Sequence, residues 1–222
     1  MNLISEDTVG TVDSFPLSMQ QVFLLGRERA LGRPLLAGAL IDLPTGCSRT
    51  RIESALATLA IRHEILRTRF VRIPGLKLPL QSIRPDAAAN CAAWSGPADL
   101  AALLDRARAQ IDEEAVPLFA AVVDDGDRLF LAAPLHGLDR HSLARLSREL
   151  WDLLQGGQAD AEDGLHYADY AVWQNDLLAS EAGDEGRAFW RGLLDSASAP
   201  VELPFARDAA SGPPARTSLR IV

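Results

Sequence analysis

The sequence predicts an α/β protein in which a mixed sheet is flanked by helices. Hydrophobic residues make up 48% of the 222 residues, which is enough for a buried core without disulfides. Short apolar runs bounded by turn residues alternate with segments of helical period, so we expect both strands and helices. These segments do not follow the regular strand–helix–strand order of a parallel sheet. Gly156-Gly157 is typical of a helix end and not of a phosphate-binding loop, so nucleotide binding has no support.

Two capping boxes mark expected helix starts in the first half of the chain. Ser18 and Gln21 have the Ser-x-x-Gln spacing that lets each side chain bond the other residue's backbone N–H. Thr50 and Glu53 repeat this spacing and should open a second helix. The apolar positions that follow this second box near helical period are Ile52, Leu56, Leu59 and Leu66.

The remaining elements follow from periodicity and turn residues. The turn sequence Asp-Asp-Gly-Asp at 124–127 separates two apolar runs, so 118–123 and 128–133 should form a hairpin. Ser142 is expected to cap the next helix. The expected order is a helix from 18, an extended segment over 34–43, a helix from 50, a strand over 68–73, a partly extended stretch over 78–94, a helix over 99–115, the hairpin, and helices over 142–155, 166–180 and 184–195.

Charge and cysteine content exclude several function classes. The 22 basic and 30 acidic residues give a net charge of −8, which lacks the basic surface that nucleic acids require. No apolar run approaches the roughly 18 residues of a membrane span, and no signal-peptide pattern opens the chain. Cys47 and Cys91 have no metal-ligand or redox spacing and should be free thiols. We therefore expect a soluble, cytoplasmic protein.

The densest polar cluster lies between an expected strand and an expected helix, at 136–141. One interpretation is a metal site made of His136, Asp139 and His141, although no second cluster supplies a further ligand. Another is a histidine general base, since imidazole titrates near neutral pH. The residues alone favour a third, structural interpretation, in which Asp139 pairs with an arginine and Ser142 caps the following helix.

Five short segments carry recognisable motifs in a fixed order. Residues 62–70 reproduce Arg-His-Glu-x-Leu-Arg-Thr-x-Phe, and residues 167–174 reproduce Tyr-x-Asp-Tyr-Ala-x-Trp-Gln. Together the segments resemble the N-terminal half of a condensation domain from a nonribosomal peptide synthetase, a family with the chloramphenicol-acetyltransferase-like fold. In chain order, the segments are 15–21, 62–70, 134–150, 167–174, and 189–190 with 201–204.

The resemblance implies one lobe of a two-lobed architecture. We expect a flexible lead-in over 1–14, a single chloramphenicol-acetyltransferase-like lobe over 15–203, and a linker with a crossover strand over 204–222 that leads toward a second lobe. Family members are about twice as long as this chain, and their substrates meet in a tunnel between two similar lobes. One lobe alone would hold half of that tunnel.

The resemblance also assigns roles to the motif at the end of the expected hairpin. In the family this motif reads His-His-x-x-x-Asp-Gly, and its second histidine deprotonates or positions the attacking amine. The motif aspartate is structural and pairs with an arginine. Asp139 would take this role here, with Arg62 or Arg67 as its expected partner.

The same motif departs from the family pattern at the residues that carry its chemistry. Aligned on the aspartate, Pro134 and Leu135 occupy the histidine positions, and Arg140 replaces the glycine. His136 lies one residue too late, which on a strand would turn it to the opposite face. His136 and His141 remain the candidates for a displaced base. Loss of a general base costs about 10²–10⁴ in rate.

These observations lead to a truncated condensation-like domain that is non-catalytic and serves as a structural or partner-recognition module. Its expected partners are an adenylation domain, a carrier protein or a tailoring enzyme. We expect no metal and no diffusible cofactor, because phosphopantetheine would arrive only as the arm of a partner carrier protein. The alternative is half of an active acyltransferase that forms an amide or ester between carrier-bound thioesters. A third possibility is a homodimer in which two copies mimic the two lobes.

Overall fold

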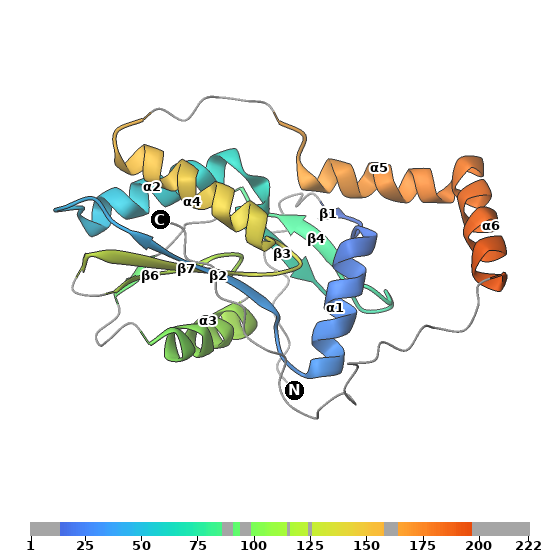
Figure 1. The fold of residues 1–222 in the computed structure, drawn as a ribbon, viewed down its shortest axis with the longest axis horizontal. Helices are drawn as coiled ribbons and strands as arrows, with labels where there is room; N and C mark the ends of the chain where they lie inside the picture. The colour runs from blue at the N-terminus through green and yellow to red at the C-terminus, as the bar shows by residue number, and fades with distance from the viewer. Residues whose placement is uncertain are drawn as a thin grey trace.

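A four-stranded mixed sheet forms the centre of the protein, with helices on both faces (Figure 1). The computed structural model describes residues 14–85, 91–93, 99–114, 116–123, 126–157 and 164–196. The strand order is β2-β7-β6-β5, with β5 parallel to β6 and the other neighbours antiparallel. The strands are β2 (Leu36–Asp42), β5 (Cys91–Ala93), β6 (Phe119–Val123) and β7 (Arg128–Pro134). The predicted mixed sheet flanked by helices is confirmed.

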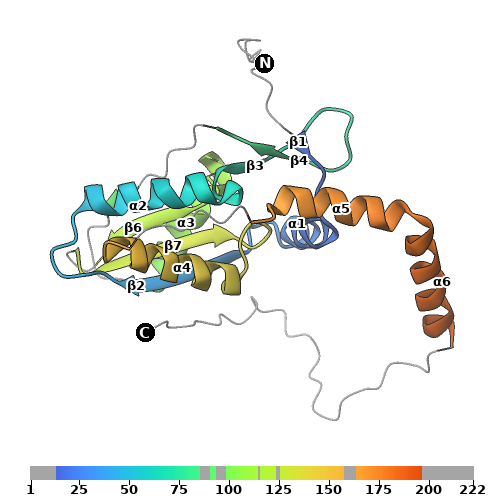
Figure 2. The ribbon, with the colours of Figure 1, turned by 90° about the horizontal axis from the view of Figure 1, so that it is seen from above.

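The central strand β7 contributes to both halves of the core. Leu129 and Leu131 pack in one apolar cluster with α2 (Arg49–Arg62) and α4 (Arg140–Leu154). Phe130 and Ala132 point to the other face, where they pack with α3 (Leu100–Glu114). Successive strand residues face opposite sides of a sheet, so a continuous apolar run is what a strand covered on both faces requires. Figure 1 shows α2 and α4 on one face of the sheet and α3 on the other, and in Figure 2, seen from above, α2 and α4 lie side by side over the strands.

A second, three-stranded sheet lies beside the central one and has the order β1-β4-β3. Its strands are β1 (Ser14–Phe15), β3 (Thr68–Val71) and β4 (Leu80–Ile83). A buried amide pair joins this sheet to α1 (Met19–Leu31), because Gln21 Nε2 donates to Gln81 Oε1 at 2.9 Å. Gln81 Nε2 in turn donates to the Pro16 carbonyl at 2.8 Å.

Of the three predicted helix caps, one is confirmed and two are wrong. The Ser18 capping box forms as predicted, with both reciprocal bonds present. The second long helix begins at Arg49 instead of after Thr50, because Ser48 Oγ already accepts from Arg51 N. This helix ends at Arg62, and a 3₁₀ turn, η1 (Glu64–Arg67), follows it. The helix expected from Ser142 begins at 140.

The cap of α4 is Asp139 and not Ser142. Asp139 has extended backbone angles, and its Oδ1 accepts the Ser142 backbone N–H at 2.7 Å. An aspartate at this position is also favoured by the partial positive charge of a helix N-terminus. The hairpin of β6 and β7, the strand β2 and the helix α3 occur where the sequence predicts them.

Two helices lead away from the central layers. The first, α5 (Tyr167–Ala179), is attached to the start of α1, since Tyr167 Oη and Ser18 Oγ lie 2.8 Å apart and Met19 N donates to Gln174 Oε1 at 2.8 Å. The second, α6 (Glu181–Asp195), turns off at Ser180 and contains no buried residue. Of the lead-in expected over 1–14, residues 1–13 lie outside the described residues, and Ser14 pairs in β1. The linker and strand expected over 204–222 also lie outside the described residues.

Candidate functional site

The end of β7 carries Pro134 and Leu135, the two residues that the motif alignment in the sequence analysis placed at the histidine positions. Pro134 is the last, buried residue of β7. Leu135 follows in a turn, where its N–H donates to the Leu35 carbonyl at 2.8 Å and its side chain packs against the core. Neither residue can accept a proton or orient an amine.

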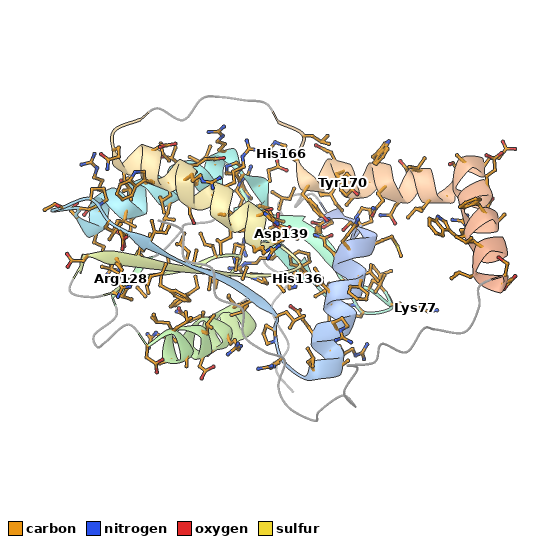
Figure 3. All side chains as sticks on the ribbon, viewed as in Figure 1. Lys77, Arg128, His136, Asp139, His166 and Tyr170 are labelled. Atoms are coloured by element: carbon orange, nitrogen blue, oxygen red, sulfur yellow. The ribbon has the colours of Figure 1, made fainter. Side chains whose placement is uncertain are left out.

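His136 lies in the turn beyond β7, so the expected strand alternation does not set the direction of its side chain. Its Nδ1 lies 3.2 and 3.3 Å from the two carboxylate oxygens of Glu28 on α1. Its ring meets the edge of Phe70 at a centroid distance of 4.4 Å and an interplanar angle of 85°. The side chain is 11% exposed. His136 therefore forms a nearly buried contact between the turn, α1 and β3 (Figure 3).

The expected pairing of Asp139 with Arg62 or Arg67 is wrong. The Asp139 carboxylate instead holds the N-terminus of α4, and the backbone N–H of Ser142 is the main cause of its lowered pKa. Arg62 Nη1 lies 3.8 Å from Glu149 Oε2, and Arg67 Nη2 lies 3.6 Å from Glu64 Oε1. The two arginines therefore lie beside glutamates, whereas the Asp139 carboxylate accepts a hydrogen bond at the N-terminus of α4, where the backbone N–H groups have no partner within the helix.

His141 and Arg140 lie on the exposed first turn of α4. Arg140 Nε donates to His141 Nε2 at 3.3 Å. Neither His141 nor His136 lines the pocket that opens on the other side of this turn. His136 and His141 therefore contact different residues and do not form a shared acid–base site.

The pocket has a volume of about 340 Å³ and lies between the end of α2, the start of α4 and the segment that leads into α5. His63 Nε2 and Glu149 Oε2 lie 2.6 Å apart at its wall. His166 Nδ1 lies 3.9 Å from Glu64 Oε2. The remaining charged residues that line it are Arg62 and Arg145. Two histidine–carboxylate pairs therefore face one cavity.

The carboxylate of Glu149 is the electrostatic centre of this pocket. Burial raises its pKa, but hydrogen bonds from His63 and Arg145 and the charge of Arg62 outweigh this effect, so the pKa is lowered. Arg145 Nε donates to Glu149 Oε1 at 3.2 Å. The ionised form of Glu149 is therefore favoured in the folded protein.

The sequence alone does not single out these pocket residues as a site. His63 belongs to the matched motif over 62–70, whose charges are equally typical of a solvated helix end. Glu149 aligns only as a helix position, and His166 directly precedes the motif over 167–174. The signal that could have identified them is the complementary charge of histidines and glutamates in separate motif segments. This signal becomes apparent only when the fold brings the segments together.

Metal and thiol chemistry find no site in the described part of the chain. No group of three or more His, Cys, Asp and Glu side chains there is placed to hold a metal ion. Cys47 and Cys91 are free thiols, as predicted. Burial raises the pKa of Cys91 to about 11, so this thiol stays protonated at neutral pH. In the same described residues, no helix is long and apolar enough to cross a membrane.

Comparison with known proteins decides the family. A family model described as the condensation domain matches residues 14–218. The chain belongs to the condensation domain family. The motifs that carried the resemblance in the sequence therefore identified it correctly, and the fold is of the chloramphenicol-acetyltransferase-like type.

Individual relatives are synthetases and condensation-fold domains. Over 199 residues, the chain is 29% identical to gramicidin S synthase 2 from Brevibacillus brevis, covering 86% of this chain and 4% of that synthase. The X-domain from teicoplanin biosynthesis is 25% identical, with a TM-score of 0.69 over 92% of this chain and 48% of that chain. A structure of the X-domain with OxyB gives 24% identity and a TM-score of 0.64 over 94% of this chain and 49% of that chain. This condensation-family chain thus spans less than half the length of these relatives.

Proposed function

We propose that this condensation-family chain does not form amide bonds and acts as a structural or partner-recognition module of a nonribosomal peptide synthetase. The proposal rests on the end of β7, where Pro134 and Leu135 lie at the positions that the motif alignment assigns to the catalytic histidines of the family. A general base must reach the proton it abstracts, and neither side chain has an atom that accepts one.

The contacts of His136 support the same conclusion. Its imidazole is 11% exposed, interacts with Glu28 and packs on Phe70, and it does not line the described pocket. These contacts join α1 to the turn after β7, so they support a structural role for His136. Replacing catalysis by recognition also fits a relative of the same fold, since the teicoplanin X-domain has been solved in complex with OxyB.

A second candidate function rests on the same Glu28–His136 pair. A carboxylate that holds one imidazole nitrogen fixes the tautomer and leaves the other nitrogen as a base, which is how catalytic histidines are oriented. In this alternative, the chain is half of an active condensation domain, with His136 as a displaced base and His141 as the weaker candidate.

Binding distinguishes the candidate partners. Calorimetry and co-elution of the 222-residue chain with an adenylation domain, and separately with a pantetheinylated carrier protein, measure recognition directly. Binding to the adenylation domain that does not require the pantetheine arm supports a structural module. Binding that requires the pantetheine arm favours the alternative, because an arm-binding surface is what a catalytic half-tunnel needs.

Turnover distinguishes recognition from catalysis. In an assembly that holds this chain and two loaded carrier proteins, we expect no amide product that depends on His136. A product that forms with the wild-type chain, is lost in His136→Ala and persists in His141→Ala would overturn the proposal. Circular dichroism of both variants confirms that they are folded.

A further inference from the structure

The described pocket contains a guanidinium group that the surrounding residues leave without a hydrogen bond. Arg62 lines the pocket from the end of α2, and its side chain is 20% exposed. Within the described residues, its nearest charged contact is Glu149 Oε2 at 3.8 Å, which is longer than a hydrogen bond. That oxygen already lies 2.6 Å from His63 Nε2. The N–H donors of Arg62 therefore have no side-chain acceptor in this part of the chain.

The two carboxylates that line the pocket have other cationic partners. Glu149 Oε1 accepts from Arg145 Nε at 3.2 Å. Glu64 Oε1 lies 3.6 Å from Arg67 Nη2. Three guanidinium groups thus share two carboxylates around the pocket, and Arg62 is the one whose charge is least compensated.

The other charged groups near the pocket do not offset this surplus. Asp139 does not line the pocket, and its carboxylate accepts the Ser142 backbone N–H at 2.7 Å. His166, the N-cap residue of α5 (Figure 3), lines the pocket with its Nδ1 3.9 Å from Glu64 Oε2. Imidazole is either neutral or positive, so His166 and His63 can only add positive charge. The pocket is therefore suited to an anion.

Aliphatic side chains form much of the remaining wall. Leu165 is 78% exposed, whereas Leu138 and Leu146 are buried. A hydrocarbon chain that lies against Leu165 would remove apolar surface from water, which is favourable. The pocket thus offers a charged contact and an apolar contact to the same ligand. The aliphatic residues that line it are Ile65, Leu138, Leu146 and Leu165.

We propose that this pocket binds a small amphipathic carboxylate, with its carboxylate group on Arg62 and its hydrocarbon chain on the aliphatic wall. A planar carboxylate accepts two parallel N–H bonds from one guanidinium group, which adds geometric fit to charge. Inorganic phosphate would satisfy the charge but would leave Leu165 uncovered. A volume of about 340 Å³ lies at the lower end of the range for small-molecule sites. This inference holds whether or not the chain is catalytic.

An NMR titration of the full ¹⁵N-labelled chain with acetate, butyrate and hexanoate measures binding. We expect hexanoate to bind with a Kd on the order of millimolar, and the affinity to rise about two- to fourfold with each added CH₂ group. The amide signals that shift should include those of Gly137 and Gly164, which line the pocket. Hexan-1-ol lacks the charge and inorganic phosphate lacks the hydrocarbon chain, so both should bind at least about tenfold more weakly than hexanoate.

Three variants separate the two contacts. Arg62→Gln should weaken hexanoate binding at least about tenfold, because an amide cannot form the charge-assisted pair. Arg51→Gln is the matched control, since Arg51 is exposed on the same helix and does not line the pocket. Leu165→Ser changes an exposed side chain and should reduce the gain in affinity from acetate to hexanoate. Circular dichroism confirms that the variants are folded.

Several outcomes would overturn the proposal. One is a wild-type chain that shows no saturable binding of hexanoate. Another is an affinity that does not rise with chain length, or phosphate binding as tight as hexanoate binding, since either would leave only a general attraction of anions. Equal effects of Arg62→Gln and Arg51→Gln would also overturn it, as would an unchanged gain in affinity in Leu165→Ser.

Discussion

The imidazole of His63 and the carboxylate of Glu149 lie 2.6 Å apart and join the end of α2 to α4. Arg62 and Arg145 reach the same carboxylate, at 3.8 and 3.2 Å. Three nitrogen-bearing side chains thus converge on one acid that is 17% exposed. The contact holds together the two helices that cover one face of the central sheet, at the wall of the described pocket.

Removing the charge of Glu149 should destabilise the fold. Glu149→Gln keeps the shape of the side chain but weakens the bonds to His63 and Arg145, and we expect a loss of about 1–2 kcal/mol in the free energy of unfolding. Urea denaturation followed by circular dichroism measures it. Glu53→Gln changes an exposed carboxylate whose bond to Arg49 lies within α2, and it serves as the control. Equal losses in both variants would contradict the role given to Glu149.

The same carboxylate predicts a direction for the pH dependence. Because the pKa of Glu149 is lowered in the folded protein, its contribution is fully present above the unfolded value of about 4.3. It is lost as the pH falls through the folded pKa, since the unfolded chain then binds the proton more readily. We expect the stability difference between wild type and Glu149→Gln to shrink when unfolding is measured at decreasing pH below about 5. A difference that grows with acid would contradict this.

The Glu28–His136 pair should contribute to stability as a coupled unit. Each side chain is 11% exposed, so removal of one partner leaves the other poorly solvated. We expect Glu28→Gln and His136→Gln each to cost about 1–3 kcal/mol, and the double variant to cost clearly less than their sum. Chemical denaturation of the four proteins of this cycle gives the coupling energy. Additive losses would mean that the pair does not interact in solution.

The capping role of Asp139 predicts which replacement the protein tolerates. Asn caps helices about as well as Asp, so Asp139→Asn should change stability little, whereas Asp139→Ala should cost about 1 kcal/mol. An ion pair with Arg62 would require the charge and would make both replacements costly. Thermal unfolding of the two variants, each with and without Arg62→Ala, distinguishes the roles. Strong coupling between Asp139 and Arg62 would contradict the observed cap.

Local signals were sufficient for much of the fold. The Ser18 capping box, the apolar run of β7 and its antiparallel pairing with β6 depend on neighbours within a few residues, and the structure confirms them. The expected start of α2 is wrong because Ser48 and Thr50 are both good caps, and the choice between them depends on how the helix packs. For the same reason, the cap of α4 was predicted at Ser142 instead of Asp139.

The sequence by itself determined the family, since the motifs over 62–70 and 167–174 are specific in composition and spacing. Only the tertiary structure decided which charges pair. Glu149 lies 86 residues from His63, and Glu28 lies 108 residues from His136. Chain distance does not limit an ion pair, because partners are chosen by the packing of helices and strands. The arginines of one motif and the aspartate of another therefore do not by themselves predict an ion pair, because the folded backbone determines which carboxylate each cation reaches.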